Sequence, residues 1–207
     1  MKEDIKTDQG AIALKHLKIA KYQVKHALLI AKSPLYNYGA HSDSVRLNLT
    51  QFRLFPVLNS LFHMFKNDMK SKDLIYEILY ESNLPEMVTS DKVRLSQILI
   101  NLISNAYKFT LTGKISLKVT KYMNYYLQFV VQDTGIGIKK EHINNIGKAF
   151  SKPSQDNLVT NADGIGLGLM ISNKIASLMG SQLRFESIEN QGTTFWFIIA
   201  VNNANPE

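Results

Sequence analysis

Amide and ammonium side chains recur along one stretch of the chain at a spacing that suits a metal–phosphate group. Five polar residues share one arc of a helix there at about 100° per residue: Arg94, Gln97, Asn101, Asn105 and Lys108. The oxygens of Asn101 and Asn105, one helical turn apart, can hold a metal ion or its water ligands. Lys108 lies a further turn on and can meet phosphate charge.

A solvated helix face is the alternative interpretation of this arc. Ile100 and Tyr107 count against it, because they lie away from the main apolar face and indicate a helix covered on much of its circumference. Asparagine is also a poor interior helix former, and an exposed helix gains nothing from two asparagines.

Two glycine-rich segments follow. The first, Asp133-Thr134-Gly135-Ile136-Gly137-Ile138, comes directly after a predicted strand. A carboxylate at a strand end can accept a hydrogen bond from an exocyclic amine, and glycines at alternate positions admit a flat ligand close to the backbone. An ordinary turn with Asp and Gly is the alternative.

The second segment, Gly164-Ile165-Gly166-Leu167-Gly168-Leu169, opens a predicted helix. Backbone N–H groups and the positive end of the helix dipole there can meet phosphate oxygens. A dinucleotide fingerprint is excluded by context, because no strand immediately precedes the glycines.

The apolar patterns predict the elements that must position these residues. Helices are expected at 11–32, 56–70, 91–109 with Asp91 as its cap, 140–148 and 167–179. Strands are expected at 51–54, 74–80, 115–122, 126–132, 183–187 and 193–201. Strands and helices do not alternate strictly, so we expect an α/β (α+β) two-layer sandwich, with a mixed sheet covered by helices on one face and one helix preceding it.

The composition is that of an ordinary globular protein. The chain has 207 residues, is 45% hydrophobic and carries a formal net charge of +7 without any cysteine. No apolar run approaches the roughly 20 residues of a membrane span, and the first residues lack a secretory signal. We therefore expect a cytoplasmic protein, or the cytoplasmic part of a membrane-anchored parent, that contacts no membrane itself. Its positive charge is spread along the chain, which does not favour a nucleic-acid partner.

Five motifs together carry a family resemblance. They occur in the order N-L-I-S-N-A-Y-K-F-T, D-T-G-I-G-I, A-F-S-K-P, G-I-G-L-G-L and Q-G-T-T-F-W-F. This set resembles the N, G1, F and G2 boxes of the GHKL superfamily, specifically the sensor histidine kinases, over about residues 49 to 201. The resemblance implies the Bergerat fold, with ATP and Mg²⁺ as cofactors held between the helical layer and a mobile lid.

The resemblance also assigns roles to individual residues. Asn105 is similar to the main Mg²⁺ ligand and Asn101 to a second contact to the metal or phosphates. Lys108 should reach phosphate and Phe109 should pack near adenine. Asp133 resembles the carboxylate that recognises the adenine amino group. The other expected nucleotide contacts, those of the glycine boxes and lid included, are Gly135, Ile136, Gly137, Phe150, Lys152, Gly164, Gly166, Leu167, Gly168, Leu169 and Thr193.

One difference within the superfamily bears on the reaction. Its hydrolytic members place a glutamate at the position of Asn101 to activate water, and an amide cannot accept a proton at neutral pH. Asn101 therefore favours phosphoryl transfer, which depends on positioning and charge neutralisation.

The resemblance divides the chain into three parts: residues 1–35 as the second helix of a dimerisation and phosphoacceptor domain, 36–48 as a linker, and 49–207 as the catalytic domain. The alternative for the first helix is an arm folded onto its own domain. No histidine has the acidic residue and proline that follow a phosphorylated histidine in this family: His16, His26, His41, His63 and His142. The implied partners are a phosphoacceptor-histidine helical domain and a response-regulator receiver domain, with a homodimeric parent.

Three functions follow from these patterns. The first is the ATP-dependent protein-histidine kinase of a two-component phosphorelay. The second is an ATP-binding signalling module without turnover. The third is a GHKL ATPase or a related protein-serine kinase.

Overall fold

The computed structural model describes residues 46–143 and 168–203. The elements follow one another as β1 (Thr50–Arg53), α2 (Leu54–Lys70), β2 (Ile75–Tyr80), β3 (Met87–Ser90), α3 (Lys92–Phe109), β4 (Lys114–Met123), β5 (Tyr126–Asp133), α4 (Lys140–Ile143), α5 (Gly168–Leu178), β6 (Arg184–Ile188), β7 (Gly192–Ala200) and β8 (Asn202–Asn203). The predicted helix at 11–32 and the second half of that at 140–148 lie outside the described residues.

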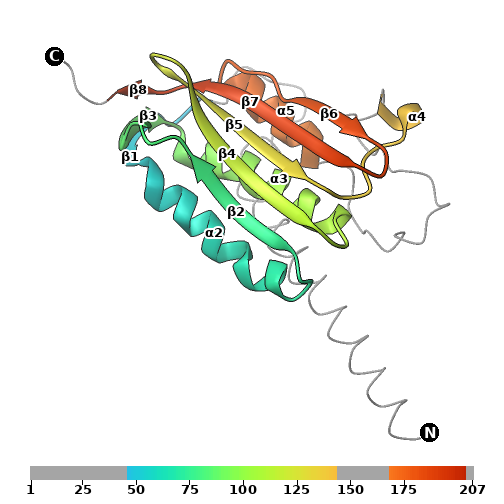
Figure 1. The fold of residues 1–207 in the computed structure, drawn as a ribbon. Helices are drawn as coiled ribbons and strands as arrows, with labels where there is room; N and C mark the ends of the chain where they lie inside the picture. The colour runs from blue at the N-terminus through green and yellow to red at the C-terminus, as the bar shows by residue number, and fades with distance from the viewer. Residues whose placement is uncertain (1–45, 144–167, 204–207) are drawn as a thin grey trace, which may run out of the picture. The chain divides into compact units, whose positions relative to one another are not determined.

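A five-stranded sheet in the order β2-β4-β5-β7-β6 forms one layer. β2 and β4 run parallel, whereas the β4–β5, β5–β7 and β6–β7 pairs are antiparallel. α2, α3 and α5 lie along one face of this sheet (Figure 1). The predicted mixed sheet with helices on one face is therefore confirmed.

A second sheet, in the order β1-β3-β8, was not predicted from the sequence. β3 has four residues and β8 has two, so neither carries a measurable hydrophobic period. β3 pairs with β1 and β8, which lie far from it in the chain, and this pairing defines the sheet. The first strand ends at Arg53, one residue earlier than expected, because Leu54 already begins α2.

The core lies between the five-stranded sheet and the helical layer. Alternate residues of β4, β5 and β7 face it and are buried: Ile115, Leu117, Val119, Leu127, Phe129, Val131, Phe195, Phe197 and Ile199. Phe129 and Phe197 are directly opposite each other, and their rings stack at 5.3 Å between centroids. On the helical side of the core, α3 contributes five buried apolar residues: Leu95, Ile98, Leu99, Leu102 and Ile103. This burial fixes α3 across the middle strands.

Side chains hold both ends of α3. The Asp91 carboxylate accepts hydrogen bonds from the backbone N–H of Arg94 at 3.0 Å and of Asn48 at 3.0 Å. The predicted N-cap is therefore confirmed. At the other end, Lys72 Nζ donates to the carbonyl of Tyr107 at 2.7 Å and lies 4.1 Å from the centre of its ring. A cation at this end also complements the helix dipole.

None of the helices within 46–143 and 168–203 is both long and apolar enough to cross a bilayer.

The cap predicts a defined loss of stability. Replacing Asp91 by alanine removes the acceptor for one buried and one part-buried N–H group and should lower the free energy of unfolding by about 1–2 kcal/mol, measured by urea titration of circular dichroism. Asp91→Asn keeps an oxygen at the cap and should lose less. An equal loss in the two variants would contradict the capping role.

Candidate functional site

The polar arc of α3 is covered. Arg94, Gln97 and Asn101 are buried, and Asn105 and Lys108 are half-buried. Arg94 Nη1 donates to Gln97 Oε1 at 3.0 Å, so charge and amide are paired along the helix. The solvated-face interpretation of this arc is therefore wrong, because none of its five side chains is fully exposed to solvent. Buried polar side chains such as these need hydrogen-bond partners.

The first turn of α5 lies against Asn101. Asn101 Nδ2 donates to Ser172 Oγ at 2.8 Å, and both residues are buried. A Cβ atom on Gly168 would overlap Asn101 Oδ1, so a larger residue there would displace the amide. The amide thus spans one turn of α5, from position 168 to position 172.

Asp133 ends β5 as a buried carboxylate. Its Oδ1 accepts from the backbone N–H of Gly135 at 2.9 Å and of Thr193 at 3.3 Å. Burial raises the pKa of this carboxyl above its ordinary value, and the two backbone donors act in the opposite direction. Both donors use Oδ1, which directs the remaining oxygen away from them.

The turn after Asp133 packs its backbone on two other segments. Ile136 N–H donates to the carbonyl of Phe109 at 3.1 Å, and its own carbonyl accepts from Asn190 N–H at 2.7 Å. A Cβ on Gly135 would overlap the Phe109 carbonyl. Gly137 has a φ of +64°, and a Cβ there would overlap the backbone of Ile188. These two glycines are therefore required by contacts within the protein itself.

The remaining described residues of the predicted site lie on β7, at the end of α3 and at the start of α5. Thr193 is buried on β7, and its Oγ1 lies 2.9 Å from Ser187 Oγ. Lys108 Nζ is 5.1 Å from the centre of the Phe109 ring at the end of α3. Leu169 is half-buried in the first turn of α5.

The lid and most of the second glycine segment fall outside the described residues. These are Phe150, Lys152, Gly164, Gly166 and Leu167. The structure thus brings together the predicted residues of α3, of the turn after β5, of β7 and of the start of α5. Ser172 was not predicted. Its position one helical turn after Gly168 is the only sequence signal that marked it.

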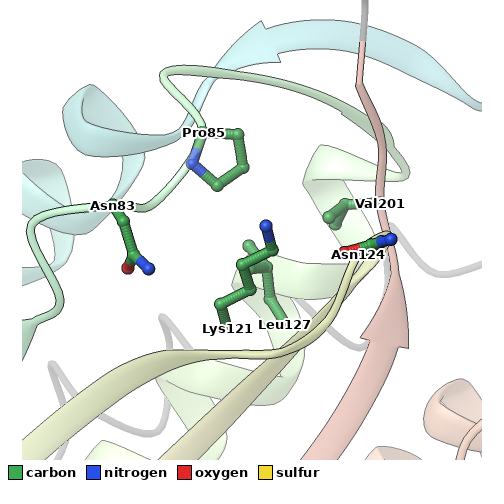
Figure 2. A pocket seen from close by; sticks show the side chains of 6 residues that line it. All are labelled: Asn83, Pro85, Lys121, Asn124, Leu127 and Val201. Atoms are coloured by element: carbon green, nitrogen blue, oxygen red, sulfur yellow. The ribbon is translucent and has the colours of Figure 1, made fainter.

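A separate cavity of about 120 Å³ lies at the far end of β5. Figure 2 shows the six side chains that line it, those of Lys121 and Leu127 among them. Leu127 precedes Asp133 by six residues, which is roughly 20 Å along a strand. None of the predicted nucleotide-binding residues lines this cavity, so it is not part of the candidate site.

The donor set fits a metal that is shared with a ligand. Among residues 46–143 and 168–203, no group of three His, Cys, Asp or Glu side chains could hold a metal ion alone. Amide oxygens are hard ligands, and Mg²⁺ is commonly held by one or two protein oxygens together with phosphates and water. Asn101 and Asn105 suit that role.

Asp133 predicts a pH dependence of stability. Because its folded-state pKa is raised, the folded chain binds this proton more tightly than the unfolded chain, and stability falls as the pH rises through the folded-state pKa. Asp133→Asn keeps an oxygen for both N–H donors and removes the titration. The free energy of unfolding of Asp133→Asn relative to wild type should therefore increase between about pH 4 and about pH 7. A constant difference in urea titrations across that range would contradict this assignment.

Comparison with known proteins agrees with this geometry. Residues 90–203 match the family described as histidine kinase-, DNA gyrase B-, and HSP90-like ATPase. The chain is 31% identical over 199 residues to the signal transduction histidine-protein kinase BarA of Escherichia coli (strain K12). This match covers 94% of this chain and 22% of BarA. It is 42% identical over 140 residues to the aerobic respiration control sensor protein ArcB homolog of Haemophilus influenzae, covering 67% of this chain and 42% of that protein.

Solved structures show the same fold. Full-length ShkA in complex with AMPPNP superposes with a TM-score of 0.71 at 27% identity, covering 88% of this chain and 36% of that chain. The catalytic domain of the histidine kinase ThkA gives a TM-score of 0.62 at 26% identity, covering 74% of this chain and 96% of that domain. The chain spans about a fifth of the length of BarA. It belongs to the histidine kinase-, DNA gyrase B- and HSP90-like ATPase family, and within it to the catalytic domains of the sensor histidine kinases of two-component signalling.

Proposed function

We propose that this chain binds Mg-ATP and transfers the γ-phosphoryl group to a histidine of a helical phosphoacceptor domain. The observation that carries the proposal is the meeting of the amide-bearing face of α3 with the first turn of α5 at Asn101, Gly168 and Ser172. A helix N-terminus offers N–H donors and positive potential to phosphate. Amide oxygens beside it can share a cation with that phosphate.

The adenine would lie at the end of β5. Asp133 directs one carboxylate oxygen to its backbone donors, which leaves the other oxygen to accept from the adenine amino group. Phe109 contributes apolar surface from the end of α3. Thr193 supports the carboxylate through its backbone N–H and would reach the base through water. Gly135, Ile136 and Gly137 would border the base as backbone.

The triphosphate would lie along α3 toward α5. Asn105 is the proposed principal Mg²⁺ ligand and Asn101 the second, with Lys108 placed to meet phosphate charge. Bound Mg²⁺ would neutralise the charge of the phosphates. Gly164, Gly166, Leu167, Gly168 and Leu169 complete the phosphate side in this proposal, and Phe150 and Lys152 the lid.

The chemistry of Asn101 favours transfer over hydrolysis. Its NH₂ group donates to Ser172, and an amide cannot remove a proton from water. A histidine acceptor needs no such base, because a neutral imidazole nitrogen is itself the nucleophile. That nitrogen forms a bond to the γ-phosphorus while the bond to the β–γ bridging oxygen breaks, and ADP departs with both electrons of that bond.

The proposed partners follow from this reaction. The acceptor is a helical domain that carries the histidine, and a response-regulator receiver domain takes the phosphoryl group onward. In this proposal the parent protein is a homodimer, and the catalytic domain faces the cytoplasm. BarA and the ArcB homolog, which the chain matches over part of their lengths, are a histidine-protein kinase and a sensor protein by name.

Removing the principal metal ligand should weaken nucleotide binding. Asn105→Ala should reduce the affinity for labelled ATP in Mg²⁺ by at least about tenfold, because even outer-shell partners of a metal contribute that much. Binding in excess EDTA should change little. Asn59→Ala, at an exposed position on α2, is the matched control and should behave as wild type. Unchanged affinity of Asn105→Ala in Mg²⁺ would refute the metal assignment.

Phosphoryl transfer is tested with a separate acceptor. The chain is mixed with a helical phosphoacceptor domain and with ATP labelled in its γ-phosphate. We expect acid-labile label on the acceptor and none on the chain alone. Binding without transfer to any acceptor tested would favour a signalling module without turnover, and acid-stable label would indicate a protein-serine kinase. Label on His16 or His26 of the chain alone would place the acceptor within it.

A further inference from the structure

One buried side-chain hydrogen bond joins the two helices that flank the proposed phosphate site. Asn101 and Ser172 are 71 residues apart in sequence, and Asn101 Nδ2 donates to Ser172 Oγ at 2.8 Å. Both side chains are almost fully withdrawn from solvent, with exposed fractions of 6% and 2%. A polar contact this deeply buried has no competing solvent and therefore controls the orientation of the groups that make it.

The contact distinguishes the two ends of the Asn101 amide. Its nitrogen faces Ser172, one turn further along α5, and its oxygen faces Gly168, where α5 begins. A carbonyl oxygen placed beside the positive end of a helix dipole is in the favourable orientation. The opposite orientation would turn the NH₂ group toward this positive end, which is unfavourable, although the Ser172 hydroxyl could pair with either end of the amide.

We propose that Ser172 is a positioning residue that holds the Asn101 amide with its oxygen toward the start of α5, where the metal and phosphates are proposed to bind. This inference rests on the proposed function. The two ends of an asparagine amide are nearly identical in shape, so the helix dipole at the start of α5 decides which end faces it, and the hydrogen bond to Ser172 holds the amide in that orientation. An amide turned the other way presents donor protons to a cation, and it cannot serve as a ligand.

The same contact fixes the start of α5 against α3. Gly168 and Ser172 are one helical turn apart and both touch the Asn101 side chain. Loss of the serine hydroxyl should therefore affect the cation side of the site through the Asn101 amide. Asp133 and Phe109, which are proposed to hold the base, keep their own contacts.

The test compares nucleotide binding by the full chain with and without Mg²⁺. Ser172→Ala should weaken the affinity for labelled ATP by about tenfold in Mg²⁺, the lower end of the range for outer-shell partners of a metal. In excess EDTA its affinity should stay within about twofold of wild type, because the amide then has no cation to meet. Ser172→Thr retains the hydroxyl and should restore Mg²⁺-dependent affinity.

The matched control is Ser177→Ala. This serine lies on the exposed side of the same helix, and its hydroxyl donates to the carbonyl of Asn173 at 2.9 Å. It should bind nucleotide as wild type does under both conditions. If Ser172→Ala does not fold, Ser172→Cys gives the same comparison, since a thiol is close in size and a weak acceptor.

A double-substitution cycle separates orientation from general structural damage. In a chain that already carries Asn101→Ala, the further change Ser172→Ala should have no effect on affinity in Mg²⁺, because the group that Ser172 orients is gone. Additive losses would overturn the inference, as would equal losses with and without Mg²⁺. If Ser172→Ala binds ATP in Mg²⁺ with wild-type affinity, the inference about Ser172 is overturned and the proposed function is unaffected. A wild-type chain that binds no nucleotide under either condition would instead overturn the proposed function and the inference with it.

Discussion

Burial of polar side chains along α3 is the constraint on which the site depends. A buried donor or acceptor without a partner costs more than most hydrogen bonds contribute, so each such group on α3 demands a complementary group on the same helix or on a neighbouring element. Asp91 accepts hydrogen bonds from the backbone N–H groups of Asn48, which precedes β3 in the chain, and of Arg94, which follows it. Asn101 donates to Ser172 on α5. The register of α3 against the rest of the domain is consequently defined by hydrogen bonds as well as by apolar packing, and a rotation of the helix would break several of them together.

The turn after β5 imposes a second constraint of a different kind. Gly135 and Gly137 lie where the backbone of this turn touches α3 on one side and the β6–β7 hairpin on the other. Side chains at these positions would collide with main-chain carbonyls, which cannot move without the elements that carry them. The same contacts therefore hold Asp133 in place. Close approach of the backbone to a ligand is thus not the only reason for glycine here, and the turn keeps its shape through the protein's own contacts.

Sequence patterns predicted the parts of the fold that repeat a period over many residues. The alternation in β4, β5 and β7 and the apolar stripe of α3 are long enough to identify both the element and its buried face. β3 and β8 were not predicted, because they are strands through pairing with distant strands rather than through local preference. In the site, residue types and spacing indicated the two amides and the carboxylate. The hydrogen bonds of these groups could not be found in this way, because the bond from Asn101 to Ser172 and that from Thr193 to Asp133 join segments 71 and 60 residues apart. Thr193 was indicated only through the family resemblance.

Asp133 shows why the site cannot be understood from stability alone. A buried carboxylate with a raised pKa is less favourable in the folded chain than in water at neutral pH, and two backbone donors to one oxygen offset this only in part. An asparagine could accept the same two hydrogen bonds without the charge. Its second terminal group would be a donor, however, and two donors cannot pair with the amino group of adenine. In the proposed function, the carboxylate at the end of β5 therefore serves ligand recognition rather than stability. The fold accommodates it because the backbone contacts of Gly135 and Gly137 hold the surrounding turn in place.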